Sequence, residues 1–274
     1  MTDSLRGTPT LIGFPYDASS SHIRGTAAAP PIIRAALHSP AGNRATESGA
    51  DISDPAVLQD DGDVALGAPA EARRDIEAAT RRLLKRGRRL IALGGDHSIT
   101  YPIVRAVRAR NPRLSILLFD AHPDLYPEFE GDRFSHACPF ARILDEGLCD
   151  QLVMVGIRTM NATQAAVAAR YGVQVIDMAS WAGGGSARQR FTLTAPVYVS
   201  IDVDGFDPAF APGVSHREPG GLSVREVLTA LDQLTVPIAG ADVVEFNPGQ
   251  DPVGLTAPVC AKLVKQLAGR MTVA

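Results

Sequence analysis

The chain has 274 residues, of which 45% are hydrophobic, and this is enough to bury one large core in a single domain spanning residues 1–274. A formal net charge of −3 at pH 7, with no basic stripe and no run of roughly 20 apolar residues, argues against nucleic acid and membrane as partners and leaves a small molecule. Three scattered cysteines indicate no disulfide framework, and the polar start Met1–Pro9 has no secretory signal, so we expect a cytoplasmic protein.

Short apolar runs rich in β-branched residues alternate along the chain with longer amphipathic stretches. The runs predict strands at Thr10–Phe14, Arg89–Leu93, Leu114–Phe119, Gln151–Val155, Val173–Ile176, Val197–Ile201 and Val236–Val243. The amphipathic stretches predict helices at Ala70–Arg86, Ile99–Arg110, Ala162–Tyr171, Val224–Leu234 and Pro258–Ala268. This alternation is typical of βαβ units, so we expect an α/β fold: a three-layer α/β/α sandwich with a mainly parallel sheet.

Local signals mark several boundaries between these elements. Pro112 ends the helix that precedes the Leu114 strand. Ser223, followed three residues later by Glu226, predicts a capping box at the start of the Val224 helix. The weakly patterned region Ser39–Asp60 is expected to be a surface excursion, and Gly183–Gly185 a flexible loop without a phosphate-binding role.

Three short runs, Gly94–Ser98, Asp120–Asp124 and Ser200–Asp204, concentrate residue types that bind metals. Six residues in them are candidate ligands: His97, Asp120, His122, Asp124, Asp202 and Asp204. Four carboxylates and two imidazoles are too many for one ordinary metal ion, but they suit two ions that share bridging ligands. The runs therefore predict a dinuclear metal site of the kind found in hydrolases.

Each of these runs directly follows a predicted strand. Ligands of parallel α/β sheets bind outside the carboxyl ends of the strands, where all three runs would meet. Alternate residues of an extended segment point the same way, so Asp120, His122 and Asp124 are expected to face one point. The Gly94-Gly95 pair would let the backbone approach a crowded cluster closely.

For any one run alone, a turn or a helix cap explains an Asp or His after a strand equally well. A shared cluster is different, because four buried carboxylates without cations would be prohibitively costly. Oxygen and imidazole ligands without thiolate favour Mn²⁺, with Ni²⁺, Co²⁺, Fe²⁺ or Zn²⁺ as alternatives. Cys138 lies close to His136 in the sequence, but a lone cysteine is more often a buried apolar residue than a nucleophile.

Together with Gly13–Asp17, Ser135-His136, Ser200–Gly213 and Glu245–Pro248, these runs resemble the ureohydrolase superfamily of arginase, agmatinase, guanidinobutyrase and formiminoglutamase. Two segments, residues 120–142 and 215–223, are most similar to its agmatinase-type branch, which includes plant-type arginases. The resemblance implies an arginase-like fold, a homotrimer or homohexamer, and two Mn²⁺ ions per chain. It pairs His97 with Asp124 at one metal and His122 with Asp204 at the other, with Asp120 and Asp202 as bridges.

The resemblance also implies the reaction. Two metals would lower the pKa of a bridging water, and the resulting hydroxide would attack a guanidino carbon to release urea and an amine. Asp124 would orient the hydroxide, His136 would carry a proton to the leaving amine, and Glu245 would pair with the guanidinium. Without the family, His136 would be interpreted as a surface loop histidine and Glu245 as a solvated charge. His216, which follows the loop Asp202–Pro212, is expected to be a hydrogen-bonded loop residue, with a place at the border of the pocket as the alternative.

The loop Tyr126–Arg133 lies between the metal ligands and His136, so it is expected to contact the far end of the substrate. Glu128 and Glu130 would suit a cationic tail, whereas Arg133 would suit a carboxylate. The sequence therefore favours hydrolysis of agmatine to putrescine, with arginase, guanidinobutyrase or guanidinase, and formiminoglutamase as alternatives.

Two readings from other classes are more distant. A single-zinc deacetylase of related fold would lack His97 and the Asp202/Asp204 pair in this form, and a non-catalytic binding protein would have lost a ligand or the proton shuttle. Two departures from the family pattern concern the surroundings of the site: Ala29 stands where relatives usually have glycine, and the segment Ala179–Ala195 is short.

Overall fold

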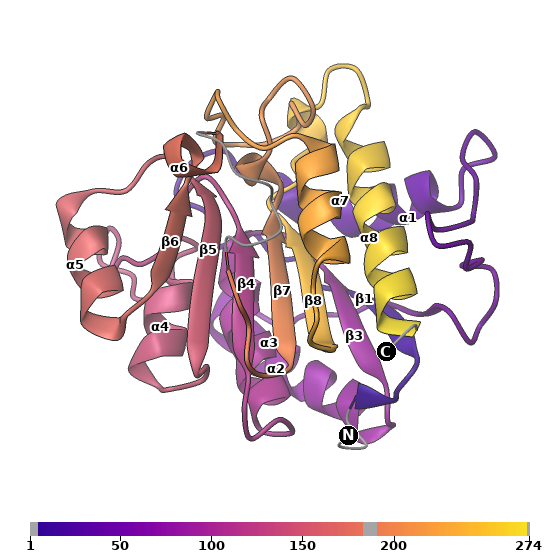
Figure 1. Ribbon diagram of the computed structural model, residues 1–274, viewed down its shortest axis with the longest axis horizontal. Helices are drawn as coiled ribbons and strands as arrows, with labels where there is room; N and C mark the ends of the chain where they lie inside the picture. The colour runs from indigo at the N-terminus through magenta and orange to yellow at the C-terminus, as the bar shows by residue number, and fades with distance from the viewer. Residues whose placement is uncertain (1–4, 183–190, 273–274) are drawn as a thin grey trace.

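The computed structural model describes residues 5–182 and 191–272, and its strands form a single eight-stranded sheet (Figure 1). The strands are β1 (Pro9–Gly13), β2 (Gln59–Asp63), β3 (Arg89–Leu93), β4 (Ser115–Phe119), β5 (Gln151–Ile157), β6 (Gln174–Asp177), β7 (Val197–Asp202) and β8 (Ile238–Val244). Their order across the sheet is β2-β1-β3-β8-β7-β4-β5-β6, and every pairing is parallel. The expected parallel α/β fold is confirmed.

Helices cover both faces of the sheet and complete the three layers. They are α1 (Ala29–Leu37), α2 (Pro69–Lys85), α3 (Thr100–Arg108), α4 (Pro139–Asp145), α5 (Ala162–Tyr171), α6 (Met178–Ala182), α7 (Val224–Asp232) and α8 (Thr256–Thr272). The first core cluster contains apolar residues of α1, α6, α7 and α8, and the second contains those of α2 to α5. Figure 1 shows α7 and α8 in front of the sheet and α2 and α3 behind it.

The central strands are apolar on both faces because both faces are covered. In β4, Leu117 and Phe119 belong to the core on one side, whereas Ile116 and Leu118 belong to the core on the other. Successive side chains of a strand point to opposite faces, so a continuous apolar run is what a doubly covered strand requires.

The structure adds an edge strand, β2, and three helices, α1, α4 and α6, that sequence patterning did not indicate. Strand β2 has the sequence QDDGD and pairs with β1 at the edge of the sheet, so its first residues fall within the expected surface excursion 39–60. Ile52 and Leu58 of the same segment are buried in the core, so the segment is not confined to the surface. Helices α1 and α4 both begin near prolines, which are tolerated in a first helical turn. Ala29 is the first residue of α1 and is fully buried.

Other local expectations have mixed outcomes. The capping box is present: the Ser223 side chain accepts from the Glu226 amide, and the Glu226 carboxylate accepts from the Ser223 amide at 2.8 Å. Gly183–Gly185, and the part of 179–195 between residues 183 and 190, lie outside the described residues. In the ranges that the structure describes, no helix is long and apolar enough to cross a membrane.

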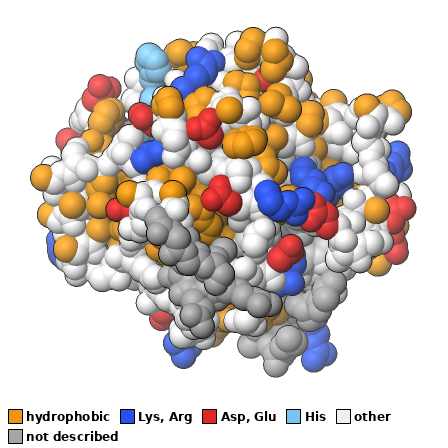
Figure 2. Space-filling model, turned by 45° about the horizontal axis from the view of Figure 1, so that its top comes forward, with side chains coloured by type: hydrophobic (Ala, Val, Ile, Leu, Met, Phe, Trp, Pro, Cys, Tyr) orange, Lys and Arg blue, Asp and Glu red, His pale blue; other side chains and the backbone are white. Residues whose placement is uncertain are grey.

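Ion pairs connect the segment 39–60 to helices α7 and α8. Glu47 accepts hydrogen bonds from Arg225 of α7 at 2.7 and 2.8 Å, and Lys262 of α8 lies 2.8 Å from the same carboxylate. Figure 2 shows acidic and basic side chains lying side by side on this side of the molecule. The Arg225 and Lys262 partners lower the pKa of Glu47 to about 2.

Candidate metal centre and active site

Four neighbouring strands deliver the candidate site residues to one edge of the sheet. In the order β3-β8-β7-β4, these strands are followed or ended by His97, Glu245, Asp202 and Asp120, respectively. Because the strands are parallel, their carboxyl ends lie together. The sheet topology therefore brings residues that are up to 148 positions apart in the chain to one place.

Close backbone packing below the site requires the two glycines that precede Asp96. A Cβ on Gly95 would lie 1.7 Å from the carbonyl oxygen of Tyr16, and one on Gly94 would lie 2.5 Å from Cγ1 of Val244. The Gly95 amide donates to the Phe14 carbonyl at 3.1 Å, and its own carbonyl accepts from the Glu245 amide at 2.9 Å. This packing brings the turn after β3 against the turn after β8.

The imidazole of His97 faces three carboxylates at once. Its Nδ1 lies 3.0 Å from Asp124 Oδ2, 3.0 Å from Asp202 Oδ2 and 3.3 Å from Asp120 Oδ2. His97 and Asp120 are fully buried, yet His97 Nδ1 and Asp120 Oδ2 have no hydrogen-bond partner. Buried polar atoms without partners are costly, and a cation between these four groups would satisfy them.

A second group adjoins the first and shares Asp120 with it. Nδ1 of His122 lies 3.1 Å from Asp204 Oδ2 and 3.7 Å from Asp120 Oδ1. The ligand atoms of His97, Asp120 and Asp202 lie within 4.8 Å of one another, and so do those of Asp120, His122 and Asp204. The structure thus brings all six predicted ligands together as two adjacent groups.

The pKa shifts of the buried residues show that the two ligand groups concentrate negative charge. Burial and neighbouring carboxylates raise the pKa of Asp120 and Asp202 well above the usual range. Burial alone would lower the pKa of His97, but its three carboxylate neighbours raise it well above the ordinary value. Oxygen and neutral imidazole donors of this number and closeness fit two divalent metal ions, and they do not select one metal among Mn²⁺, Fe²⁺, Co²⁺, Ni²⁺ and Zn²⁺.

His136 and Glu245 form an ion pair beside the candidate metal centre. His136 Nδ1 lies 2.9 Å from Glu245 Oε1, which also accepts from the His97 backbone amide at 2.9 Å. Burial opposes charge on His136, but Glu245 outweighs it and raises the pKa of His136 to about 9. On the other side of the ring, Nε2 lies 2.8 Å from Ser21 Oγ. His136 is therefore held at both nitrogens, by Glu245 on one side of the ring and by Ser21 on the other.

Two of the site residues have unusual backbone conformations. Asp124 has φ +48° and Glu245 has φ +63°, both in the left-handed region that residues with side chains rarely adopt. Residues held in this way cost of order 1–3 kcal/mol and cluster at functional sites. Here the backbone hydrogen bond from Glu245 to Gly95 fixes one of them.

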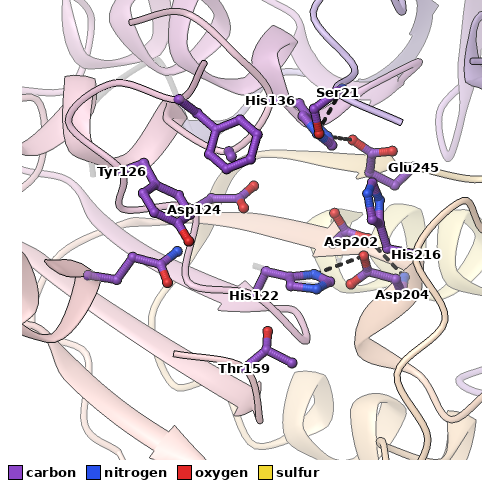
Figure 3. Close-up of a pocket in the computed structure, with 13 residues that line it drawn as sticks. Ser21, His122, Asp124, Tyr126, His136, Thr159, Asp202, Asp204, His216 and Glu245 are labelled. Atoms are coloured by element: carbon purple, nitrogen blue, oxygen red, sulfur yellow. Dashed lines mark hydrogen bonds and ion pairs between the residues drawn. The ribbon is translucent and has the colours of Figure 1, made fainter. Parts of the chain in front are cut away.

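A cavity of about 240 Å³ opens over these residues (Figure 3). Its floor contains Asp124, Asp202, Asp204 and His122, and His136 and Glu245 stand on one side. The other walls are formed by Ser21, Tyr126, Phe129, Ala137, Thr159, Gln164 and His216. Figure 3 shows the labelled polar groups pointing into a common space.

The charged residues expected to contact the substrate tail lie elsewhere. Glu128, Glu130 and Arg133 are exposed and do not line the cavity. The Phe129 and Asp132 backbones exchange hydrogen bonds at 3.0 and 2.9 Å, and this tight turn directs the intervening residues away. Tyr126 and Phe129 of the same loop face the cavity instead.

Sequence reasoning left open whether His216 borders the pocket, and it missed Ser21. His216 lies in a loop and lines the cavity, and its ring centroid lies 5.4 Å from that of His136. Ser21 had no signal of its own, since a serine in a polar segment is unremarkable. The position of Ser21 follows from a contact of Asp96. The Asp96 carboxylate accepts from the Ser19 amide at 3.0 Å and fixes the loop that carries Ser21 beside His136.

The alternative of a cysteine nucleophile finds no support. Cys138 is fully buried, and burial raises the pKa of its thiol to about 12. A thiol in this state is not a thiolate near neutral pH, so it cannot act as a nucleophile.

Fold and site together define a metal-dependent hydrolase built on a parallel α/β sheet. A family model described as the Arginase family matches residues 8–269, and the chain belongs to this family. It is accordingly a hydrolase that acts on guanidino C–N bonds. The resemblance to ureohydrolases is confirmed, and the readings as a single-zinc deacetylase or a non-catalytic protein lose their support.

Similarity to the plant arginases extends over nearly the whole chain. Arginase 1, mitochondrial, of Arabidopsis thaliana is 44% identical over 284 residues, covering 97% of this chain and 82% of the relative. The solved structure of arginase from Medicago truncatula has a TM-score of 0.92 and 42% identity, covering 97% of this chain and 88% of that one. N(1)-aminopropylagmatine ureohydrolase of Thermus thermophilus is 39% identical over 208 residues, covering 74% of this chain and 69% of the relative.

These relatives correct two expectations. The stronger and longer similarity to plant arginases supports the arginase alternative over the expected agmatinase activity. The expected cytoplasmic location is wrong by the same comparison, because the Arabidopsis and Medicago relatives are named mitochondrial. Its basis was weak in physical terms: few cysteines and a polar start do not distinguish the cytoplasm from the interior of an organelle.

Proposed function

We propose that the protein is an arginase that hydrolyses L-arginine to urea and ornithine with two Mn²⁺ ions. The observation that carries the proposal is the 44% identity to a plant arginase over 97% of the chain, combined with the two adjacent ligand groups that share Asp120. Agmatine, which lacks the carboxylate of arginine, is the competing substrate.

The metal ions would be held by the six clustered residues. His97, Asp120, Asp124 and Asp202 surround one position, and His122, Asp120 and Asp204 surround the other. When bound, such a pair of ions supplies an activated water near neutral pH and neutralises charge on the buried carboxylates.

The remaining groups act on the substrate. Glu245 uses Oε1 for His97 and His136, so its second oxygen, Oε2, is proposed to accept from the guanidinium. His136, protonated and held by Ser21, is proposed to donate the proton that the leaving amine needs. Asp124 is proposed to accept a hydrogen bond that orients the attacking water.

An amino-acid head group requires polar partners at the outer end of the cavity. Thr159 and Gln164 offer hydroxyl and amide groups on the cavity walls, and the Tyr126 hydroxyl there receives a hydrogen bond from the Asn161 side-chain amide at 2.6 Å. Neutral donors of this kind suit a carboxylate, whereas the acidic residues expected to attract the amine of agmatine lie outside the walls.

Urea release from a substrate panel tests the proposal. Mn²⁺-loaded protein is given arginine, agmatine and 4-guanidinobutyrate over the same series of concentrations, formamide release from formiminoglutamate is measured alongside, and kcat/KM is compared. The proposal requires arginine to be the best substrate. A higher kcat/KM for agmatine would replace arginase by agmatinase, and hydrolysis of formiminoglutamate alone would refute both. A homotrimer or homohexamer is proposed for the assembly, and light scattering coupled to gel filtration tests it.

A further inference from the structure

The far side of the His97 ring contacts a buried polar network that the proposed mechanism does not use. His97 Nε2 lies 3.0 Å from Ser200 Oγ, and Ser200 Oγ donates to Asp242 Oδ1 at 2.6 Å. His97, Ser200 and Asp242 are all fully buried. Ser200 of β7 and Asp242 of β8 are directly paired in the sheet, so their separation is fixed by strand register.

Counting hydrogens determines the direction of each bond. A serine hydroxyl has one hydrogen, and that of Ser200 points to Asp242. Ser200 Oγ can therefore only accept from His97, which requires the hydrogen of a neutral imidazole to be on Nε2. Nδ1 then carries the lone pair, and it is this nitrogen that faces Asp120, Asp124 and Asp202.

We propose that Asp242, acting through Ser200, is a positioning device that holds His97 in the tautomer able to bind metal. The proposal rests on the metal site of the proposed function. Partners on the second nitrogen of a ligating histidine fix its tautomer and orientation in metal sites generally. Here the Ser200 hydroxyl lies between the Asp242 carboxylate and the His97 imidazole. Ser200 and Asp242 both belong to central strands of the sheet, β7 and β8.

Two further hydroxyls keep the Asp242 carboxylate in place. Thr100 Oγ1 donates to Oδ2 at 2.8 Å, and the Tyr198 hydroxyl donates to the same oxygen at 2.7 Å. Three donors orient the carboxylate so that Oδ1 remains directed at Ser200. The set of Ser, His and Asp is no nucleophilic triad, because the serine hydrogen goes to the aspartate and the serine is inaccessible.

The second histidine lacks an equivalent partner among the described residues. Nε2 of His122 lies 3.8 Å from Glu218 Oε1, beyond hydrogen-bond distance, and the His122 side chain is 26% exposed. The network therefore serves one of the two ligand groups, and its loss should weaken the binding of one metal ion more than that of the other.

Equilibrium binding of Mn²⁺ to Ser200→Ala tests the proposal without any activity measurement. Free Mn²⁺ is measured by electron paramagnetic resonance during titration of metal-free protein, and circular dichroism confirms the fold. We expect the wild type to bind two ions and Ser200→Ala to bind one of them 10- to 100-fold more weakly, roughly the loss found for such partners elsewhere. Asp242→Asn, which preserves volume, should weaken the same ion and serves if Ser200→Ala does not fold.

Two variants distinguish positioning from general damage to the core. Thr80→Val removes a fully buried hydroxyl that donates to the Ile76 carbonyl within α2, apart from the network, so its Mn²⁺ affinity should stay close to that of the wild type. Ser200→Thr keeps the hydroxyl and should restore affinity. Wild-type binding of both ions by folded Ser200→Ala and Asp242→Asn would overturn the proposal while leaving the metal site intact. A wild type that binds no Mn²⁺ would overturn the proposed function as well.

Discussion

Replacing Glu245 by glutamine isolates the charge on which the proposed mechanism depends. Glutamine preserves the shape of the side chain and one oxygen that can accept from the His97 amide, which Glu245 does at 2.9 Å. It removes the negative charge that lies 2.9 Å from His136 and that is proposed to pair with the guanidinium. Any large effect therefore reflects electrostatics rather than packing.

Two separate effects are expected from this substitution. A hydrogen bond to a charged partner contributes about 1.5–3 kcal/mol, so loss of the guanidinium contact should lower kcat/KM by about 10- to 150-fold. Glu245 also raises the pKa of His136 to about 9. An opposite charge at this distance shifts a pKa by about 1–3 units, so the pKa of His136 should fall by that amount in the variant.

The sign of the pH effect follows from the role of His136 as a proton donor. Its protonated form is present below its pKa, so wild-type activity should fall as the pH rises through about 9, and that of Glu245→Gln should fall at lower pH. Profiles of kcat/KM against pH for arginine measure both effects. Glu128→Gln, an exposed charge outside the cavity, is the matched control and should behave like the wild type. An unshifted alkaline limb with kcat/KM within threefold of the wild type would refute the role of Glu245.

Three further substitutions test other parts of the site and surface. Asp124→Asn should abolish detectable urea release while leaving the circular dichroism spectrum unchanged, because asparagine tolerates the φ of +48° at this position; near-normal turnover would contradict the role of Asp124. His136→Ala should lower kcat by about 10²–10⁴-fold with little change in bound Mn²⁺ measured by atomic emission, and an unchanged kcat would remove it as the proton donor. Glu47→Gln should lower the free energy of unfolding in urea at pH 7 by about 0–1 kcal/mol, a small figure because the pair is exposed. Since the pKa of Glu47 is lowered from 4.5 to about 2, that difference should shrink as the pH falls from 4.5 towards 2, and a difference that grows there would be contrary to the assignment.

The central strands and the ligand cluster could be predicted from the sequence because their signals are local. Strand β4, with the sequence SILLF, is apolar at four of its five positions, and Asp120 follows it directly. Once parallel strands are inferred, residues after them must meet at one edge. Strand direction places His97, Asp120 and Asp202 on one edge of the sheet, and the strand order β3-β8-β7-β4 then makes them neighbours.

Elements whose stability comes from their neighbours could not be predicted in this way. Strand β2 consists of polar residues and glycine, and what makes it a strand is its pairing with β1 at the sheet edge. The network of Ser200 and Asp242 depends on the register of β7 against β8, which the sequence does not state. An aspartate within an apolar run, as Asp242 is in β8, is nevertheless a signal, because a buried carboxylate requires partners.

The agmatine expectation has less support than the arginase alternative for a related reason, since it used the charge of a loop without its conformation. The loop 126–133 carries acidic residues, and charge alone favoured the amine of agmatine. Glu130, with φ +50°, and Gly131, with φ +82°, form a turn closed by the Phe129 and Asp132 hydrogen bonds, and Glu128 and Glu130 are left exposed. The two side chains of this loop that line the cavity are Tyr126 and Phe129, and neither offers a negative charge to an amine. Discrimination between arginine and agmatine must then come from hydrogen bonding at the walls, so exchanging Glu128 should leave the substrate preference unchanged whereas exchanging Gln164 should alter it.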